Sequence, residues 1–228
     1  MPRTEIDDTF DRMENLRERG AVLQIFPEVH LDPRGSFAEI LKFGAGTVPT
    51  SQKWILDSKW IRQINRSKSV SGVVRGMHTQ KGSHCQGKLV EAVNRKIFDV
   101  IVDARPDSST FGVSKVYALD PSTQNMIFVP RGFLHGFVVP FEYSNEKAIF
   151  SYYCDNTYDK ASEITISPKT YLMKIVETGF AILDPEFVST VEEHDLLYSE
   201  KDVSGIDYSE FMESVRREYE DREIVWYA

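Results

Sequence analysis

Four side chains that can carry or exchange protons lie close together between residues 73 and 93. The segment reads VVRGMHTQKGSHCQGKLVEAV and contains Arg75, His78, His84 and Lys88. Many of its other residues are β-branched or apolar, as in strands. Three roles fit such a cluster: metal binding, proton transfer at a substrate carbon, or ordinary structural roles in a sheet.

Metal binding would use His78, His84 and Glu91 as ligands, with His135 from a later segment. Imidazole and carboxylate groups suit iron, manganese or zinc. Two ligands on one strand are normally two residues apart, because alternate side chains share a face. His78 and His84 are six residues apart. The spacing therefore disfavours a metal site, and we expect neither a metal nor another cofactor.

Proton transfer needs a base, a group that steadies the base, and a cation where negative charge develops. Histidine has an unperturbed pKa close to neutrality, and lysine can supply the cation. In the structural alternative, His78 and His135 are hydrogen-bonded core histidines and Lys88 is a solvated strand residue. Several polar groups in one region of sheet favour proton transfer for the cluster, whereas His84 alone fits a structural role.

The elements that position this cluster are predicted to be mainly strands. From residue 21 onward, short segments rich in β-branched and aromatic residues alternate with turn sequences such as DPRG, RPDSS and DPSTQ. Strands at roughly 8–12-residue spacing favour an antiparallel sandwich or jelly roll over alternating βαβ units. The predicted strands span residues 21–31, 36–43, 59–67, 71–77, 87–93, 96–104, 113–120, 124–130, 135–141 and 147–154.

Helices are expected at both ends of this β domain. Apolar residues at three- and four-residue spacing predict a helical extension over residues 1–20. Asp207 and Glu210 fit a capping pattern before an apolar stripe, which predicts a helix within residues 204–228. The residues between them, 21–203, are predicted to form the jelly-roll domain.

Composition and charge exclude several classes of protein. The chain of 228 residues carries a net charge of −8, so we expect no nucleic-acid partner and no attraction to anionic lipid. No segment has the length and hydropathy of a signal peptide or a transmembrane helix. Cys85 and Cys154 match no zinc or redox spacing and are expected to be reduced thiols. These features predict a cytoplasmic protein.

Seven segments form an ordered set along the chain: DPRGSFAE, NRSKSVSGVVRGMHTQ, QGKLVEAV, FDVIVDARPDSSTFG, FVPRGFLHGFVV, AIFSYYCDNTY and LYSEKD. Together they resemble the dTDP-4-dehydrorhamnose 3,5-epimerase family over about residues 30–203. The resemblance implies a cupin-type jelly roll, a metal-independent isomerase, a homodimer, and a 4-keto-6-deoxy nucleotide sugar as substrate.

The resemblance also implies catalytic roles. A 4-keto group acidifies the C–H bonds at C3 and C5, because the enolate is delocalised onto the ketone oxygen. His78 would be the base, Lys88 would stabilise the enolate, and Tyr152 would return a proton from the opposite face. Its neighbour Tyr153 would point away, since adjacent strand residues face opposite sides.

Further residues match the family's substrate contacts. Arg75 and His135 match positions that line the sugar and diphosphate, and Gln63 and Asn65 match sugar or phosphate contacts, although lone polar residues on a strand are more often solvated. Arg75 and His78 would lie on opposite faces of an ideal strand, but a bulge or a strand end at Gly76 would let both reach one site.

The DPRGSFAE segment matches a strand that crosses to the partner subunit in the family's dimers. There Arg34 would reach the diphosphate, Phe37 would pack on the nucleotide base, and Glu39 would contact the base. Taken without the resemblance, Phe37 fits an ordinary core position.

The chain departs from the family pattern where an aspartate should hold the catalytic histidine. The expected Trp-Asn-Asp-Pro is replaced by EITISPKT, whereas Asp184 in ILDPEF lies at a suitable distance from SEKD. We therefore infer an insertion over about residues 164–182 and assign Asp184 as the partner of His78. Thr79 replaces a usual aromatic residue and Arg131 a usual acidic one, which affects which sugar or base fits.

The sequence thus predicts an epimerase that acts at C3 and C5 of a 4-keto-6-deoxy nucleotide sugar. The alternatives are a single-centre epimerase acting on another nucleotide sugar, a sugar-binding homologue without activity, and a metal-dependent cupin oxygenase. Convergence of His78, Lys88, Tyr152 and Asp184 on one cavity would favour the enzyme. An Asp184 that points away, with nothing in its place, would favour the binding homologue.

Overall fold

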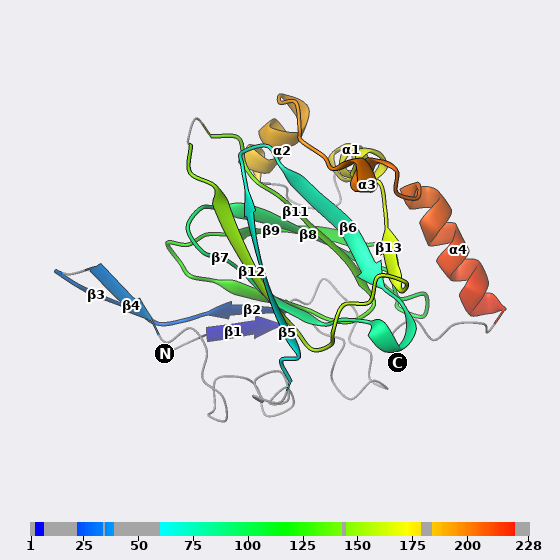
Figure 1. Ribbon diagram of the computed structural model, residues 1–228, viewed down its shortest axis with the longest axis horizontal. Coiled ribbons are helices and arrows are strands. Elements are labelled where there is room, and N and C mark those ends of the chain that lie inside the picture. The colour runs from blue at the N-terminus through cyan, green and yellow to red at the C-terminus, as the bar shows by residue number, and fades with distance from the viewer. Residues whose placement is uncertain are drawn as a thin grey trace.

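Two antiparallel sheets packed face to face form the body of the protein. The computed structural model describes residues 3–6, 22–33, 35–38, 60–142, 145–178 and 184–221. Within these ranges the six-stranded sheet has the order β1-β2-β10-β7-β12-β5, and the five-stranded sheet has the order β13-β6-β11-β8-β9. The two sheets are the layers of a jelly-roll sandwich (Figure 1). The predicted mainly-β, antiparallel fold is confirmed.

The strands are short, as their turn-rich sequence predicts. Their bounds are β1 (Arg3–Ile6), β2 (Leu23–Phe26), β3 (Val29–Asp32), β4 (Gly35–Ala38), β5 (Gln63–Ser69), β6 (Val74–Gln80), β7 (Lys88–Ala92), β8 (Ile97–Asp103), β9 (Ser114–Leu119), β10 (Met126–Val129), β11 (Phe133–Val138), β12 (Ala148–Cys154) and β13 (Glu163–Thr165).

Strand β8 shows how the core is divided. All seven of its residues are buried, and its five apolar residues are divided between two apolar clusters. Ile97 and Ile101 pack between the sheets, whereas Phe98, Val100 and Val102 pack against the helices on the outer face. The five-stranded sheet is therefore covered on both sides.

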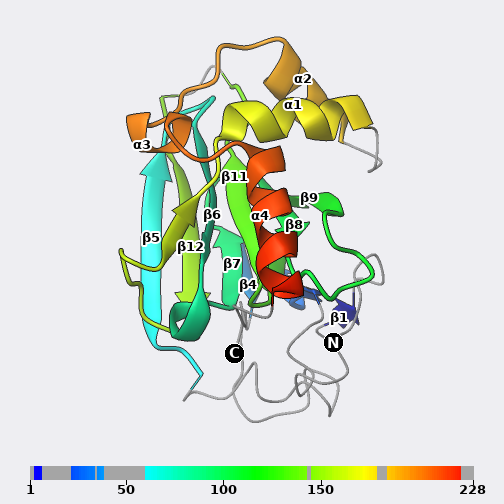
Figure 2. The same cartoon turned by 90° about the vertical axis from the view of Figure 1, so that its right-hand side faces the viewer.

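Helices α1 (Pro168–Thr178), α2 (Pro185–Glu192), α3 (Glu200–Val203) and α4 (Tyr208–Glu220) follow the last strand. They lie on the outer side of the five-stranded sheet and at one end of it (Figure 2). The Asp207 side chain caps α4 by accepting hydrogen bonds from the backbone N–H groups of Ser209 and Glu210, as the capping pattern predicts. None of the described helices is long and apolar enough to span a membrane.

The helix predicted over residues 1–20 is wrong at its start. Arg3–Ile6 form strand β1, which pairs antiparallel with β2. Without β1, strand β2 would be the sheet edge and would leave backbone N–H and C=O groups unpaired. That pairing outweighs the helical spacing of the side chains. Residues 7–21 lie outside the described residues.

The segment predicted to be an insertion, about residues 164–182, begins inside the five-stranded sheet. Its first residues belong to β13, which pairs with β6 so that Thr165 lies opposite His78. Helix α1 follows, and residues 179–183 lie outside the described part of the chain. The start of the segment is thus integral to the sheet that carries His78.

Strands β3 and β4 form a hairpin that projects away from the sandwich (Figure 1). Its apolar side chains are largely solvent-exposed: Leu31 is 80% exposed and Phe37 is 68% exposed. The Phe37 ring stacks only loosely on His30, with 6.4 Å between centroids. The hairpin therefore buries little apolar surface within its own chain.

Candidate active site

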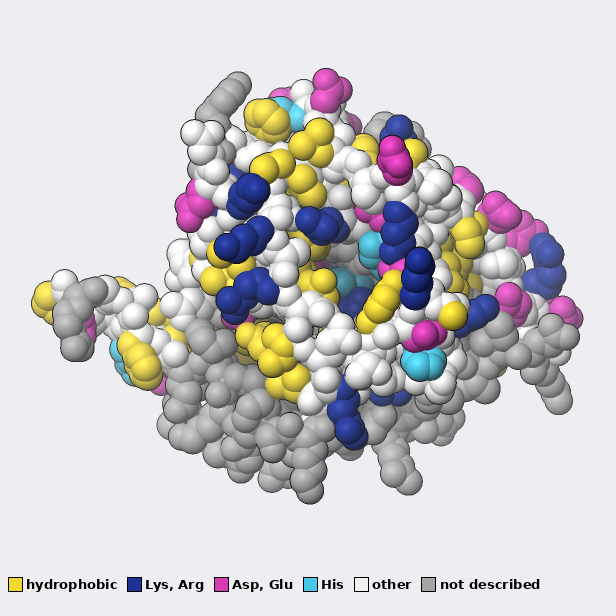
Figure 3. Space-filling view, viewed as in Figure 1, with side chains coloured by type: hydrophobic (Ala, Val, Ile, Leu, Met, Phe, Trp, Pro, Cys, Tyr) yellow, Lys and Arg dark blue, Asp and Glu magenta, His cyan; other side chains and the backbone are white. Residues whose placement is uncertain are grey.

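A cavity of about 640 Å³ opens between the two sheets. Strands β5, β7 and β12 line it from the six-stranded sheet, and β6, β11 and β13 line it from the five-stranded sheet, with α3 at its rim. It is visible as a hollow on one face of the molecule (Figure 3). Its volume suits a small organic ligand. Seven of the predicted site residues line it: Gln63, Asn65, Arg75, His78, Lys88, His135 and Tyr152.

A bulge in β6 brings Arg75 and His78 to the same cavity. His78 pairs with His135 of β11, but Arg75 pairs with Phe137, so the register shifts by one residue between them. Gly76, at the shift, has a φ of +100°, and a Cβ there would lie 2.8 Å from the His135 carbonyl oxygen. Only glycine fits this conformation and this close approach. The predicted bulge is confirmed.

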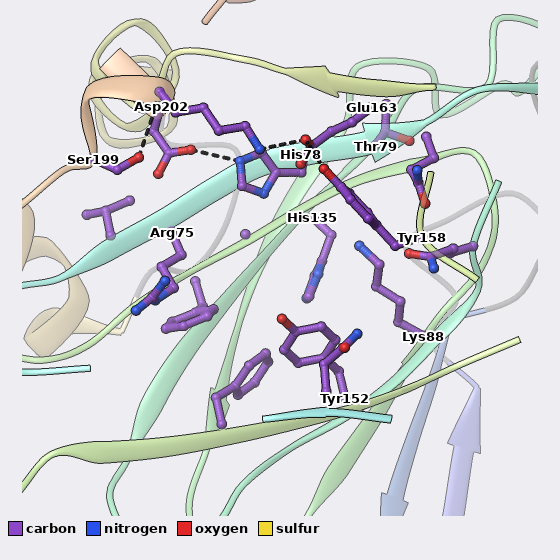
Figure 4. A pocket seen from close by; sticks show the side chains of 18 of the residues that line it. Arg75, His78, Thr79, Lys88, His135, Tyr152, Tyr158, Glu163, Ser199 and Asp202 are labelled. Carbon is purple, nitrogen blue, oxygen red and sulfur yellow. Dashed lines mark hydrogen bonds and ion pairs between the residues drawn. The ribbon is translucent and has the colours of Figure 1, made fainter. Parts of the chain in front are cut away.

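The carboxylate bound to His78 belongs to Asp202. Its Oδ1 lies 2.8 Å from His78 Nε2, and the other ring nitrogen faces the cavity (Figure 4). Asp202 is 4% exposed and sits in α3, where its backbone N–H donates to the Ser199 hydroxyl. A carboxylate in this position fixes the orientation and the tautomer of the imidazole.

The assignment of Asp184 to this role is wrong. Asp184 is the N-cap of α2, where its side chain accepts a hydrogen bond of 2.9 Å from the Glu186 backbone N–H. Pro185 at the first helical position completes a common helix start. The Asp184–Pro185 pair therefore marks the start of α2, and Asp202 is the aspartate that lies beside His78.

The ionised Asp202 carboxylate makes the stability of the fold depend on pH. Burial opposes its ionisation, but hydrogen bonds from His78 and Ser199 and the charge of Lys201 outweigh burial and lower the pKa of Asp202 below 3.8. A lowered pKa stabilises the fold above the unfolded-state pKa and loses that contribution as the pH falls through the folded-state value.

We therefore expect the stability difference between wild type and Asp202→Asn to shrink as the pH falls from 5 to below 3.8, the ordinary pKa of an aspartate, because the folded protein then loses the contribution of the ionised carboxylate. Urea unfolding at several pH values measures this difference, and changes in other carboxylates cancel between the two proteins. A difference in unfolding free energy that stays constant across this range would contradict the assignment.

Tyr152 faces His78 across the cavity (Figure 4). Burial raises the pKa of Tyr152, and the nearby charge of Arg75 offsets this only in part, so the phenol is protonated at neutral pH. Tyr153 instead donates a 2.8 Å hydrogen bond to Glu91 on the other face of the sheet. As predicted, only one of the two neighbouring tyrosines lines the cavity.

His135 forms a second histidine–carboxylate pair deeper in the site. Its Nε2 lies 2.7 Å from Asp99 Oδ2, and Asp99 is fully buried on β8. The His135 ring also stacks on Phe150 with 6.2 Å between centroids. These contacts fix the ring in the cavity wall.

The cavity rim contains a group that sequence reasoning missed. The Glu163 carboxylate accepts hydrogen bonds from Tyr158 Oη at 2.7 Å and from Lys201 Nζ at 2.6 Å. Burial opposes ionisation of Glu163, but these two donors and the charge of His78 lower its pKa overall. Through these two hydrogen bonds, Glu163 of β13 joins Tyr158 of the β12–β13 loop to Lys201 of α3 beside His78.

One predicted substrate-binding residue, Phe37, does not line the cavity. Phe37 lies on the projecting β3–β4 hairpin, while Arg34 and Glu39 lie outside the described residues. Of the two departures from the family pattern, Thr79 lines the cavity. Arg131 instead pairs with Asp155 at 2.8 Å.

No group of three or more His, Cys, Asp or Glu side chains among the described residues is placed to hold a metal ion. His78 and His135 each bind a carboxylate through Nε2. The expectation that the chain works without a metal or cofactor remains a prediction.

The fold and the cavity together define a β-sandwich protein equipped for proton transfer on a small organic molecule. The family model of dTDP-4-dehydrorhamnose 3,5-epimerase matches residues 19–210. The chain therefore belongs to this family.

Individual relatives agree with that assignment. A dTDP-4-dehydrorhamnose 3,5-epimerase of Shigella flexneri is 33% identical over 186 residues, covering 81% of this chain and 89% of the relative. A dTDP-4-dehydrorhamnose 3-epimerase of Streptomyces niveus is 33% identical over 165 residues, covering 72% of this chain and 75% of the relative. The crystal structure of the 3,5-epimerase from Elizabethkingia anophelis is similar with a TM-score of 0.64 and 31% identity, covering 91% and 97%.

Proposed function

We propose that this chain epimerises C3 and C5 of a dTDP-linked 4-keto-6-deoxy sugar through enolate intermediates, without a metal. The observation that carries the proposal is the His78–Asp202 pair, which faces Tyr152 across one cavity. Epimerisation needs a base on one face of the substrate and an acid on the other. His78 comes from the five-stranded sheet and Tyr152 from the six-stranded sheet, so a sugar between them meets both.

In the proposed mechanism, His78 removes the proton from C3 or C5 while Asp202 stabilises the imidazolium that forms. The electrons of the C–H bond move into the carbonyl group and give an enolate. Lys88, on the floor of the cavity, supplies the positive charge for the enolate oxygen. Arg75 offers a planar donor group that suits diphosphate oxygens.

Tyr152→Phe separates deprotonation from inversion. The variant keeps the ring that packs on Phe150, with 5.8 Å between centroids, and deletes only the hydroxyl. We expect solvent deuterium to enter the sugar still, because His78 can remove a proton and return one on its own face. Inverted product should fall sharply.

NMR of the reaction in deuterated water measures exchange and inversion together. Tyr153→Phe is the matched control and should invert the sugar normally, because Tyr153 faces Glu91. Normal amounts of doubly inverted sugar from Tyr152→Phe would assign the acid to another group.

A single-centre epimerase is the second candidate. The Streptomyces niveus relative is named as a 3-epimerase at the same identity as the 3,5-epimerase of Shigella flexneri. The cavity residues discussed above are compatible with either outcome. The position of deuterium in the product distinguishes them.

An inactive sugar-binding homologue is less well supported. Asp184 points away from the cavity, which would favour that alternative if nothing replaced it. Asp202 does replace it, at hydrogen-bond distance from His78, so the base retains its carboxylate.

We also propose a cytoplasmic homodimer in which the β3–β4 hairpins are exchanged. The hairpin projects from its own sandwich, and its exposed Leu31 and Phe37 side chains would be buried against a partner. Phe37, together with Arg34 and Glu39, would then complete the partner's site rather than its own. Cys85 and Cys154 are buried and not joined to each other by a disulfide, which suits a reducing compartment.

Mixing two inactive variants tests the exchange. The first, His78→Asn, keeps an intact hairpin. The second, Arg34→Ala/Phe37→Ala, keeps an intact cavity. Co-refolded at equal amounts, they should regain activity at about a quarter of all sites, because half of the dimers pair one chain of each kind and each has one complete site. No gain over the separate variants would mean that each hairpin serves its own chain.

A further inference from the structure

A second cavity lies on the outer side of the five-stranded sheet, away from the site described above. It has a volume of about 460 Å³ and is enclosed by α1, α4 and the loop that joins β8 to β9. Figure 2 shows this corner, where α4 runs below α1 beside the loop. The volume lies within the range of small-molecule sites.

The walls of this cavity are aromatic and apolar. Phe111 comes from the loop, Tyr171 from α1, and Tyr208 and Met212 from α4. The rings of Tyr171 and Tyr208 lie 5.1 Å apart. Side chains of this kind favour a ring-bearing ligand, because they offer flat apolar surfaces for stacking.

A buried hydroxyl without a hydrogen bond lies in the same wall. The Tyr171 side chain is only 1% exposed, and among the described residues its Oη has no partner with hydrogen-bond geometry. The Ser114 side chain also lines the cavity and opposes the rise in the pKa of Tyr171. Burial raises the pKa of Tyr171 well above its usual value, so the group stays a neutral donor. A buried donor left unpaired is costly, and a ligand oxygen in the cavity would satisfy it.

The rim carries two exposed cations against one acid. Lys174 Nζ lies 4.9 Å from the centre of the Tyr208 ring, and the Arg216 guanidinium lies 5.4 Å from the centre of the Phe111 ring. Glu213 is the acidic residue of the lining. The two cations thus stand over the aromatic walls, where they would meet an acidic group on a bound ring.

We propose that this cavity binds an amphipathic organic anion, with an apolar ring system held between Phe111, Tyr171 and Tyr208 and an acidic group near Lys174 and Arg216. The site is separate from the cavity that contains His78, because its residues belong to the outer face of the sheet and to the helices that cover it. Binding there does not depend on the proposed epimerase activity.

The fluorescent aromatic anion 8-anilinonaphthalene-1-sulfonate provides the test. Titrated into the full chain, it should bind saturably at one molecule per chain. Lys174→Glu/Arg216→Glu should weaken binding by about tenfold or more, because two attractive charges become repulsive. Both residues are exposed, so the fold should survive, as circular dichroism can verify. Met212→Trp, which fills the cavity, should also weaken binding.

Two controls locate the probe. Lys68→Glu/Lys147→Glu makes the same double charge change at exposed residues outside the cavity lining and should leave the affinity nearly unchanged. Arg75→Glu, in the other cavity, should also leave the affinity nearly unchanged. The proposal is overturned if the probe does not bind saturably, if Lys174→Glu/Arg216→Glu binds it as well as Lys68→Glu/Lys147→Glu does, or if Arg75→Glu is the variant that weakens it.

Discussion

His78→Asn should lower the turnover of the sugar by about 10²–10⁴-fold, the usual contribution of a positioned general base. His78 points into the cavity with Tyr152 on the opposite side (Figure 4), and its Nε2 bonds Asp202. Asparagine keeps a polar side chain that can bond Asp202 but cannot accept the proton. Binding of the nucleotide sugar should change little, because the lost interaction belongs to the transition state.

His84→Asn is the matched control. His84 lies in a short 3₁₀ helix, Gly82–His84, and does not line the cavity. It should retain nearly full turnover. Steady-state rates and the affinity for dTDP should be measured for both variants. Turnover of His78→Asn within a few-fold of wild type would remove His78 from the mechanism.

Asp202→Asn should impair turnover by up to about 10⁴-fold, as when the carboxylate that orients a catalytic histidine becomes an amide. The amide can still bond Nε2 but no longer favours the imidazolium, and it can hold the ring in the wrong tautomer. Asp184→Asn is the control, since its side chain caps α2 and lies apart from His78. It should leave both stability and turnover nearly unchanged, because asparagine is about as good an N-cap as aspartate.

The double variant His78→Asn/Asp202→Asn tests whether the pair acts as a unit. The two effects should be strongly non-additive, so that the double variant is little worse than His78→Asn alone. Additive losses would assign Asp202 a role independent of His78. A large loss in Asp184→Asn with normal unfolding stability would restore the partner that the sequence suggested.

The residues that share a strand or a turn with a recognisable pattern could be predicted from the sequence. Period-two alternation separates Tyr152 from Tyr153, and a glycine between Arg75 and His78 indicates the bulge that brings both to one cavity. These are local geometric rules. They hold because neighbouring strands enforce the pleat.

The partner of His78 could not be derived in the same way. Asp202 lies 124 residues further along the chain, and both Asp184 and Asp202 stand at helix starts that local sequence explains equally well. Ser199 and Asp202 fit a capping box, yet the Asp202 carboxylate bonds His78 instead of closing the box. Only the position of α3 over β6 distinguishes the two aspartates.

Strand β1 was missed for a related reason. The helical spacing of its side chains is a local signal, whereas its pairing with β2 depends on a sheet edge formed by distant segments. Tertiary pairing outweighs a weak helical preference.

Hydrogen exchange at the substrate tests the central claim most directly. dTDP-4-keto-6-deoxyglucose incubated with the wild-type chain in deuterated water should gain deuterium at both C3 and C5, with inversion at both carbons, and chelating agents should not slow the reaction. Proton NMR resolves the two positions. A sugar that stays fully protonated at both carbons, despite binding to the folded protein, would contradict the account.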